Sequence, residues 1–169
     1  KNIDILINNA GGSARENASK IETQKVEIID DLLDTNLRGT MLCSKEVIKY
    51  MKKNKWGRIV NIASTCGVRG LAGFSEYSTS KAGVIMFTQS LAMEVAKEGI
   101  TVNCVSPGVT EHIIWDKCIE PANTKKTYTE KLGKTDDIAN AVEFFCKEES
   151  NFIIGQNLIV DGGRSLGLK

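Results

Sequence analysis

Apolar positions along the chain fall into short continuous runs and longer segments with helical spacing. The short, mostly apolar runs predict strands at 3–8, 57–63, 100–105 and 157–160, of which the first is nearly continuous and predicted to be buried. Apolar residues three and four positions apart predict helices over 24–50, with a break near Gly39, over 74–97 and over 135–146. We expect Gly99 to end the second helix and Thr135 to cap the third. Strands that alternate with helices of this length predict an α/β fold with a parallel sheet.

Parallel sheets of this kind bind ligands beyond the carboxyl ends of their strands. Small or polar residues follow three of the predicted strands at that edge: Asn9, Ala10 and Gly11 after the first, Ser64 after the second, and Ser106, Pro107 and Gly108 after the third. A polar segment without apolar periodicity, 109–131, comes next. Because long loops next to a ligand edge are often functional, we expect it to be a substrate lid.

Composition narrows the class of protein. The chain has 169 residues, of which 41% are hydrophobic and 25% charged, as in one ordinary globular domain. Its 22 Lys plus Arg against 21 Asp plus Glu form no basic stripe, which argues against a nucleic-acid partner. No apolar run is long enough to span a bilayer, so we expect no membrane partner. Five cysteines without a C-x-x-C pair favour a reducing, cytoplasmic location.

The candidate chemistry lies between Ser64 and Lys81. Tyr77 and Lys81 are four residues apart and share one helix face, where an ammonium lowers the pKa of a tyrosine from its ordinary value of about 10. Such a pair can exchange a proton with an alcohol or carbonyl oxygen, to which Ser64 can donate a hydrogen bond. Considered one at a time, each feature has an ordinary explanation. Tyr77 and Lys81 would be an exposed pair on a helix, and Ser64 would be a serine in a turn. The combined spacing, flanked by Asn-Ala-Gly and Pro-Gly, favours a proton-transfer site.

Six segments, in order, closely resemble the short-chain dehydrogenases/reductases. They are IDILINNAG (3–11), TNLRG (35–39), GRIVNIAS (57–64), YSTSKAG (77–83), VNCVSPG (102–108) and GQNLIVDGG (155–163). The resemblance implies a catalytic tetrad of Asn36, Ser64, Tyr77 and Lys81. Tyr77 would be the general acid/base, and Lys81 would lower its pKa and bind the nicotinamide ribose. Ser64 would polarise the substrate oxygen, and Asn36 would hold a water that relays protons from Lys81.

The resemblance also implies a cofactor, NAD or NADP, and a reaction that interconverts a secondary alcohol and a ketone. The implied cofactor contacts are Asn9, Ala10 and Gly11 on the adenosine side, Pro107, Gly108 and Thr110 beside the nicotinamide, and Tyr77 and Lys81. Small-molecule substrates of the family include 3-oxoacyl thioesters, sugars or polyols, and hydroxysteroids. Family members form homodimers or homotetramers through the two long helices and the last helix and strand.

The chain departs from the family pattern in two places. The phosphate-binding fingerprint TGxxxGxG does not occur; Gly67, Gly70 and Gly73 follow Ser64 instead, and we expect them to form a flexible loop on the substrate side. His112 stands where relatives often carry a threonine, and no second ligand with metal spacing accompanies it, so we expect no metal.

Residues 1–169 are therefore predicted to be the C-terminal two-thirds of a doubly wound Rossmann-type domain, with an open edge at the first strand. We expect this fragment alone to be inactive. Two alternatives remain. One is a non-catalytic fragment that serves as an interaction module. The other is a sugar-nucleotide epimerase or dehydratase, which shares Tyr-x-x-x-Lys but usually adds a large C-terminal substrate domain.

Overall fold

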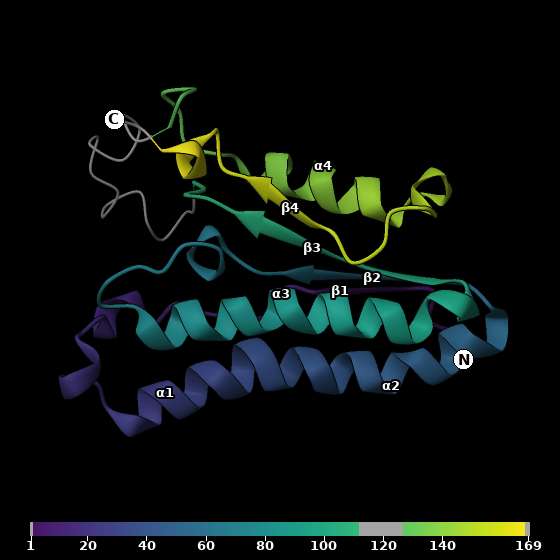
Figure 1. The fold of residues 1–169 in the computed structure, drawn as a ribbon, viewed down its shortest axis with the longest axis horizontal. Helices are drawn as coiled ribbons and strands as arrows, with labels where there is room; N and C mark the ends of the chain where they lie inside the picture. Colours follow the sequence, from purple (N-terminus) through teal and green to yellow (C-terminus); the bar gives the residue numbers. More distant parts are fainter. Residues whose placement is uncertain (1, 112–126, 168–169) are drawn as a thin grey trace.

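A four-stranded parallel sheet forms the centre of the molecule, in the order β1-β2-β3-β4 (Figure 1). The computed structural model describes residues 2–111 and 127–167. The strands are β1 (Ile5–Asn8), β2 (Gly57–Ile62), β3 (Ile100–Pro107) and β4 (Asn157–Val160). The helices are α1 (Val26–Leu32), α2 (Gly39–Asn54), α3 (Ser75–Val95) and α4 (Thr135–Cys146). The predicted strands and the α/β class are confirmed.

Helices cover both faces of the sheet, with α2 and α3 on one side and α4 on the other (Figure 1). Successive side chains of a strand point to opposite faces, so Ile59 and Val60 of β2 enter different cores. Ile59 packs in a buried cluster with residues of α2 and α3, including Met51 and Leu91. Val60 packs with α4 through Phe145. This layering leaves the carboxyl ends of the strands as the accessible edge.

Buried asparagines tie the sheet to its helices. The Asn8 amide donates to Oδ1 of Asn61 at 2.8 Å and to Oγ of Ser44 at 3.1 Å. Asn61 in turn donates to Oγ1 of Thr88 in α3 at 2.9 Å. All four side chains are at most 7% exposed, and their mutual hydrogen bonds offset the cost of removing these polar groups from water. The network fixes β1 and β2 relative to α2 and α3.

The boundaries of several elements differ from the sequence predictions. The predicted break near Gly39 is a π-helical turn, η3 (Leu33–Arg38), that joins α1 to α2 without a change of chain direction. Thr135 is not a cap; it is the first residue of α4, and the Asp137 carboxylate accepts the backbone N–H of Lys134 at 2.7 Å instead. Gly99 ends the helical segment after α3 as expected, at φ +74°.

One edge of the described sheet is β1, where Ile5 and Ile7 are 45% and 39% exposed. None of the helices in the described part of the chain is long and apolar enough to cross a membrane.

Candidate active site

Ser64 and Tyr77 meet at the carboxyl edge of the sheet. Ser64 follows β2 and caps the short helix η4 (Thr65–Gly67), where its Oγ accepts the N–H of Cys66 at 3.1 Å. Tyr77 lies in the first turn of α3, which begins at the same end of the sheet (Figure 1). The two side chains line one cavity of about 370 Å³, and Tyr77 is close enough to Ser64 for that side chain to act on its pKa. Their predicted proximity is therefore present in the structure.

Burial has the largest effect on the pKa of Tyr77. It raises the pKa of the phenol above the ordinary value, while the neighbouring Ser64 hydroxyl and the positive charge of Arg15 act in the opposite direction. Lys81 is not among the groups that shift this pKa here, and its predicted effect on Tyr77 stays a prediction. The Lys81 Nζ donates to the carbonyl oxygen of Ile62 at 2.9 Å, so its position is set by the end of β2.

Lys81 is itself buried, at 5% exposure. Because burial disfavours the ammonium form, the pKa of Lys81 falls to about 8. Gly11 lies directly against it: a Cβ added at Gly11 would come within 3.2 Å of Nζ and 2.7 Å of the Asn36 Oδ1. A glycine is required there, since any side chain would displace both groups. The loop after β1 thus contacts two members of the predicted tetrad.

Asn36 is 1% exposed and lies in the π-helical turn. Its Oδ1 accepts the N–H of Gly12 at 2.9 Å, and its amide donates to the Gly12 carbonyl at 3.0 Å and to Oγ of Ser80 at 2.9 Å. Both amide hydrogens are therefore committed to protein partners, and a water could be held only at the remaining lone pair of Oδ1. Asn36 joins the loop after β1 to helix α3. Isolated π turns of this kind are frequent at functional sites.

The residues predicted to contact a cofactor lie along the same edge. Asn9 and Ala10 are exposed after β1, and Pro107 is the last residue of β3. Gly108 approaches the chain after β4 so closely that an added Cβ would lie 2.6 Å from the Cβ of Asp161. Thr110 forms a bridge with Gly133. Its buried Oγ1 has no hydrogen-bond partner in the described part of the chain.

The loop after Ser64 is more ordered than its three glycines suggested. An added Cβ at Gly67 would lie 2.6 Å from the backbone carbon of Lys81 and 2.8 Å from the nitrogen of Ala82, so η4 packs directly on α3. Gly70 has open space around it, and Gly73 takes φ +80°. The expected flexible loop is thus anchored at its first glycine. The predicted lid falls mainly on 112–126, including His112, and lies outside the described residues.

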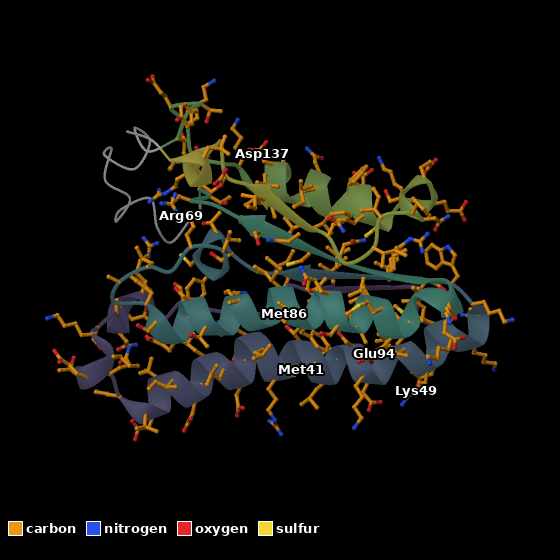
Figure 2. The ribbon with its side chains drawn as sticks, viewed as in Figure 1. Met41, Lys49, Arg69, Met86, Glu94 and Asp137 are labelled. Atoms are coloured by element: carbon orange, nitrogen blue, oxygen red, sulfur yellow. The ribbon has the colours of Figure 1, made fainter. Side chains whose placement is uncertain are left out.

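Several residues of the cavity were not found by sequence reasoning. Besides Ser64 and Tyr77, the cavity is lined by Arg15, Cys66, Arg69, Asp161 and Arg164, among others. Arg69, labelled in Figure 2, lies at the end of the sheet where the strands terminate, and its Nη1 donates to the Ser165 carbonyl at 3.2 Å. Apart from Asp161, which lies in the segment GQNLIVDGG, these residues occupy polar segments without periodicity or a recognisable motif. Histidine, cysteine and carboxylate side chains within 2–111 and 127–167 form no group of three that could hold a metal ion.

Comparisons with known proteins all match this chain to dehydrogenases and reductases. A family model described as enoyl-(acyl carrier protein) reductase matches residues 1–165. The chain is 45% identical over 167 residues to the (2S)-[(R)-hydroxy(phenyl)methyl]succinyl-CoA dehydrogenase subunit BbsD of Thauera aromatica, covering 97% of this chain and 66% of that protein. It is 43% identical to the 3-oxoacyl-[acyl-carrier-protein] reductase FabG of Rickettsia bellii, covering 95% of this chain and 67% of the relative.

Solved structures give the same picture. A crystal structure of a putative gluconate dehydrogenase from Agrobacterium tumefaciens matches with a TM-score of 0.93 at 27% identity, covering 99% of this chain and 67% of that one. ElxO Y152F with NADPH bound matches with a TM-score of 0.92 at 33% identity, covering 98% and 68%. The fold is of the Rossmann type. The chain belongs to the short-chain dehydrogenase/reductase family and spans about two thirds of the length of these relatives.

Proposed function

We propose that the protein is an NAD(P)-dependent oxidoreductase that interconverts a secondary alcohol and a ketone. The observation that carries this proposal is the half-buried Tyr77 phenol, which lines the same cavity as Ser64. A cavity of about 370 Å³ is in the range that small ligands fill. Family membership and the dehydrogenase and reductase names of the relatives support the same reaction class.

In this proposal a ketone oxygen lies between Ser64 and Tyr77. The Ser64 hydroxyl donates a hydrogen bond to that oxygen, and the Tyr77 phenol transfers its proton there during reduction. In the oxidative direction the Tyr77 phenolate removes the proton from the alcohol. Lys81, with a pKa of about 8, can carry a proton near neutral pH, and Asn36 holds the Gly12 backbone beside it. A bound nicotinamide supplies or accepts the hydride.

The edge residues fit a nicotinamide dinucleotide. Gly11 and Gly108 bring backbone close to neighbouring groups where a Cβ would not fit, and the buried Oγ1 of Thr110 offers a hydrogen-bonding group without a partner among described residues. We propose that Asn9, Ala10 and Gly11 line the adenosine side, and that Pro107, Gly108 and Thr110 flank the nicotinamide with Tyr77 and Lys81. The NADPH and NADP complexes of ElxO support this class of cofactor.

For the substrate we propose an acyl thioester with an oxo or hydroxy group. BbsD is named for a succinyl-CoA substrate and FabG for a 3-oxoacyl-[acyl-carrier-protein]. Both of these compounds are thioesters. The putative gluconate dehydrogenase keeps a sugar acid as the second candidate. We further propose a cytoplasmic homo-oligomer. Free Cys43, Cys66, Cys104 and Cys146 suit a reducing compartment, and exposed methionines on α3 suit an interface between subunits.

Replacing Tyr77 tests the reaction class. In the enzyme expressed from its complete coding sequence, Tyr77→Phe removes the transferable proton and keeps the ring, so kcat should fall by roughly 10²- to 10⁴-fold. NADH and NADPH binding, followed by cofactor fluorescence, should change little. Tyr50→Phe, in α2, is the matched control and should retain activity. Undiminished ketone reduction by Tyr77→Phe would refute the assignment, and loss of cofactor binding together with turnover would point to misfolding.

A further inference from the structure

The cavity beside Tyr77 carries an excess of positive charge. Its lining includes three arginines, Arg15, Arg69 and Arg164, and one carboxylate, Asp161, which gives a net charge of +2 from three positive groups and one negative group. The arginines come from three separate segments: the loop after β1, the loop after η4 and the short helix η8 (Arg164–Leu166). Folding therefore brings together charges that lie far apart in the sequence.

Asp161 uses both of its carboxylate oxygens in backbone hydrogen bonds. Its Oδ1 accepts the backbone N–H of Gly163 at 2.9 Å, and its Oδ2 accepts that of Ser165 at 2.6 Å. The carboxylate is thus used to shape the turn after β4. Within the described part of the chain, neither Arg69 nor Arg164 forms an ion pair with any carboxylate.

Arg164 is the least satisfied member of the group. Its Nη1 is buried and has no hydrogen-bond partner among residues 2–111 and 127–167. A guanidinium nitrogen removed from water without an acceptor is costly, so such a group is retained where a ligand supplies the acceptor. Arg69 is hydrogen bonded to the same segment through the Ser165 carbonyl, and both arginines line the cavity.

The positive wall is close to the reacting phenol. The charge of Arg15 acts on Tyr77 and lowers its pKa, and Arg15 lines the same cavity as Ser64. A group bound to the arginines and a carbonyl bound to Ser64 and Tyr77 would therefore belong to one small molecule. Arginine is suited to this task because its planar guanidinium donates two parallel hydrogen bonds to a carboxylate or a phosphate.

We propose that the substrate carries an oxyanion group, a carboxylate or a phosphate, and that Arg15, Arg69 and Arg164 bind it while Ser64 and Tyr77 hold the reacting oxygen. This inference rests on the proposed function and adds a specificity determinant to it. It selects acidic ketones and hydroxy acids over neutral ones, including thioesters that carry a second acidic group.

Matched substrate pairs test the charge preference in the complete enzyme. Acetoacetate is compared with methyl acetoacetate for the carboxylate, and dihydroxyacetone phosphate with dihydroxyacetone for the phosphate. We expect kcat/KM to favour the charged member of at least one pair by about ten- to a hundredfold, as for a hydrogen bond to a charged group. The favoured pair distinguishes carboxylate from phosphate. Equal values, or a preference for the neutral member in both pairs, would overturn the inference.

Charge variants show which residues are responsible. Arg164→Gln and Arg69→Gln should each lower the charged-to-neutral ratio of kcat/KM by about tenfold or more, since each removes a charged donor. Lys53→Gln is the matched control, because it removes one positive charge from an exposed position at the end of α2, and it should leave the ratio unchanged. An equal fall of the ratio in all three variants would indicate a general charge effect and contradict the assignment.

A binding measurement covers the case in which neither pair is turned over. Succinate and inorganic phosphate are titrated calorimetrically into the wild-type enzyme and into Arg164→Gln, with succinamide as the neutral control. Binding of at least one anion that Arg164→Gln weakens supports the inference; no binding of either anion at millimolar concentration overturns it. Tyr77→Phe separates the two claims, because it should abolish turnover and retain anion binding. If Tyr77→Phe keeps both its turnover and its preference for the anionic substrate, the proposed function is refuted and the anion site is not.

Discussion

A buried lysine that titrates close to neutral pH is the central feature at the scale of single residues. Lys81 is covered by protein and hydrogen bonded to the end of β2, and a side chain added at Gly11 would meet its Nζ. An ordinary surface lysine has a pKa of about 10.4 and is almost entirely charged near pH 7. A lysine with a pKa of about 8 can be found in both forms at working pH, as a proton relay requires.

The lowered pKa of Lys81 predicts a specific pH dependence of stability. Between pH 8 and its unfolded value of 10.5, the folded chain has released this proton while the unfolded chain still holds it. Stability therefore rises with pH in this window, by up to about 1.4 kcal/mol per pH unit. Lys81→Met removes the effect, so the free energy of unfolding of wild type minus that of Lys81→Met should increase from pH 8 to pH 10. Urea unfolding at several pH values measures it.

Lys97→Met is the control for this measurement. Lys97 is exposed after α3, and its replacement should leave the pH profile parallel to that of wild type. Tyr77 also titrates at high pH, but it is present in all three chains and cancels in the differences. Parallel profiles for wild type and Lys81→Met would show that Lys81 has an ordinary pKa in the fold.

At the scale of elements, the π-helical turn between α1 and α2 determines the geometry of the site. It carries Asn36, which reaches Gly12 in the loop after β1 and Ser80 in α3. Ser80 also donates to the Tyr77 carbonyl one turn earlier in α3. Three elements that supply site residues are therefore joined through one buried asparagine.

Ser80→Ala tests this connection. It leaves a buried amide hydrogen of Asn36 without its acceptor, which should lower the free energy of unfolding by about 1–3 kcal/mol. Thr79→Ala is the control, because Thr79 is the exposed neighbour in the same helix and its replacement should have little effect. Urea unfolding of the two variants provides the comparison, and equal stabilities would show that the Asn36–Ser80 hydrogen bond contributes nothing.

The elements were predictable from sequence to the extent that apolar periodicity defines them. Strands such as Gly57–Ile62 are short segments with apolar residues at most positions, and Gly99 has the left-handed conformation that ends a helix. The π turn leaves no such signal, because Leu33 and Leu37 keep helical spacing through it. Motif spacing found Ser64 and Tyr77. It could not find Arg69 or Arg164, which line one cavity only because two polar segments fold over the sheet edge.

At the scale of the whole molecule, exposed apolar side chains gather on the outer surfaces of the long helices. Met86 and Met93 of α3 are 61% and 76% exposed, and Met41 and Leu42 of α2 are 39% and 46% exposed. Figure 2 shows Met41 and Met86 on these two neighbouring helices. A second apolar group lies on the α4 side, where Phe152 is fully exposed and Phe144 is 45% exposed. Exposed patches of this kind mark interaction surfaces.

The proposed homo-oligomer predicts that charges on these two surfaces have different effects. Met93 follows Met86 by two helical turns, so Met86→Lys with Met93→Lys places two like charges where α2 and α3 of one subunit would meet those of another. Sedimentation velocity should then show wild type as a dimer or tetramer and this double variant at a lower mass. Phe152→Lys changes only the α4 side. If the wild type is a tetramer, this variant should sediment as a dimer; if the wild type is a dimer, this variant should remain a dimer. Circular dichroism checks that each variant remains folded, and a wild-type protein that sediments as a monomer would refute the proposal.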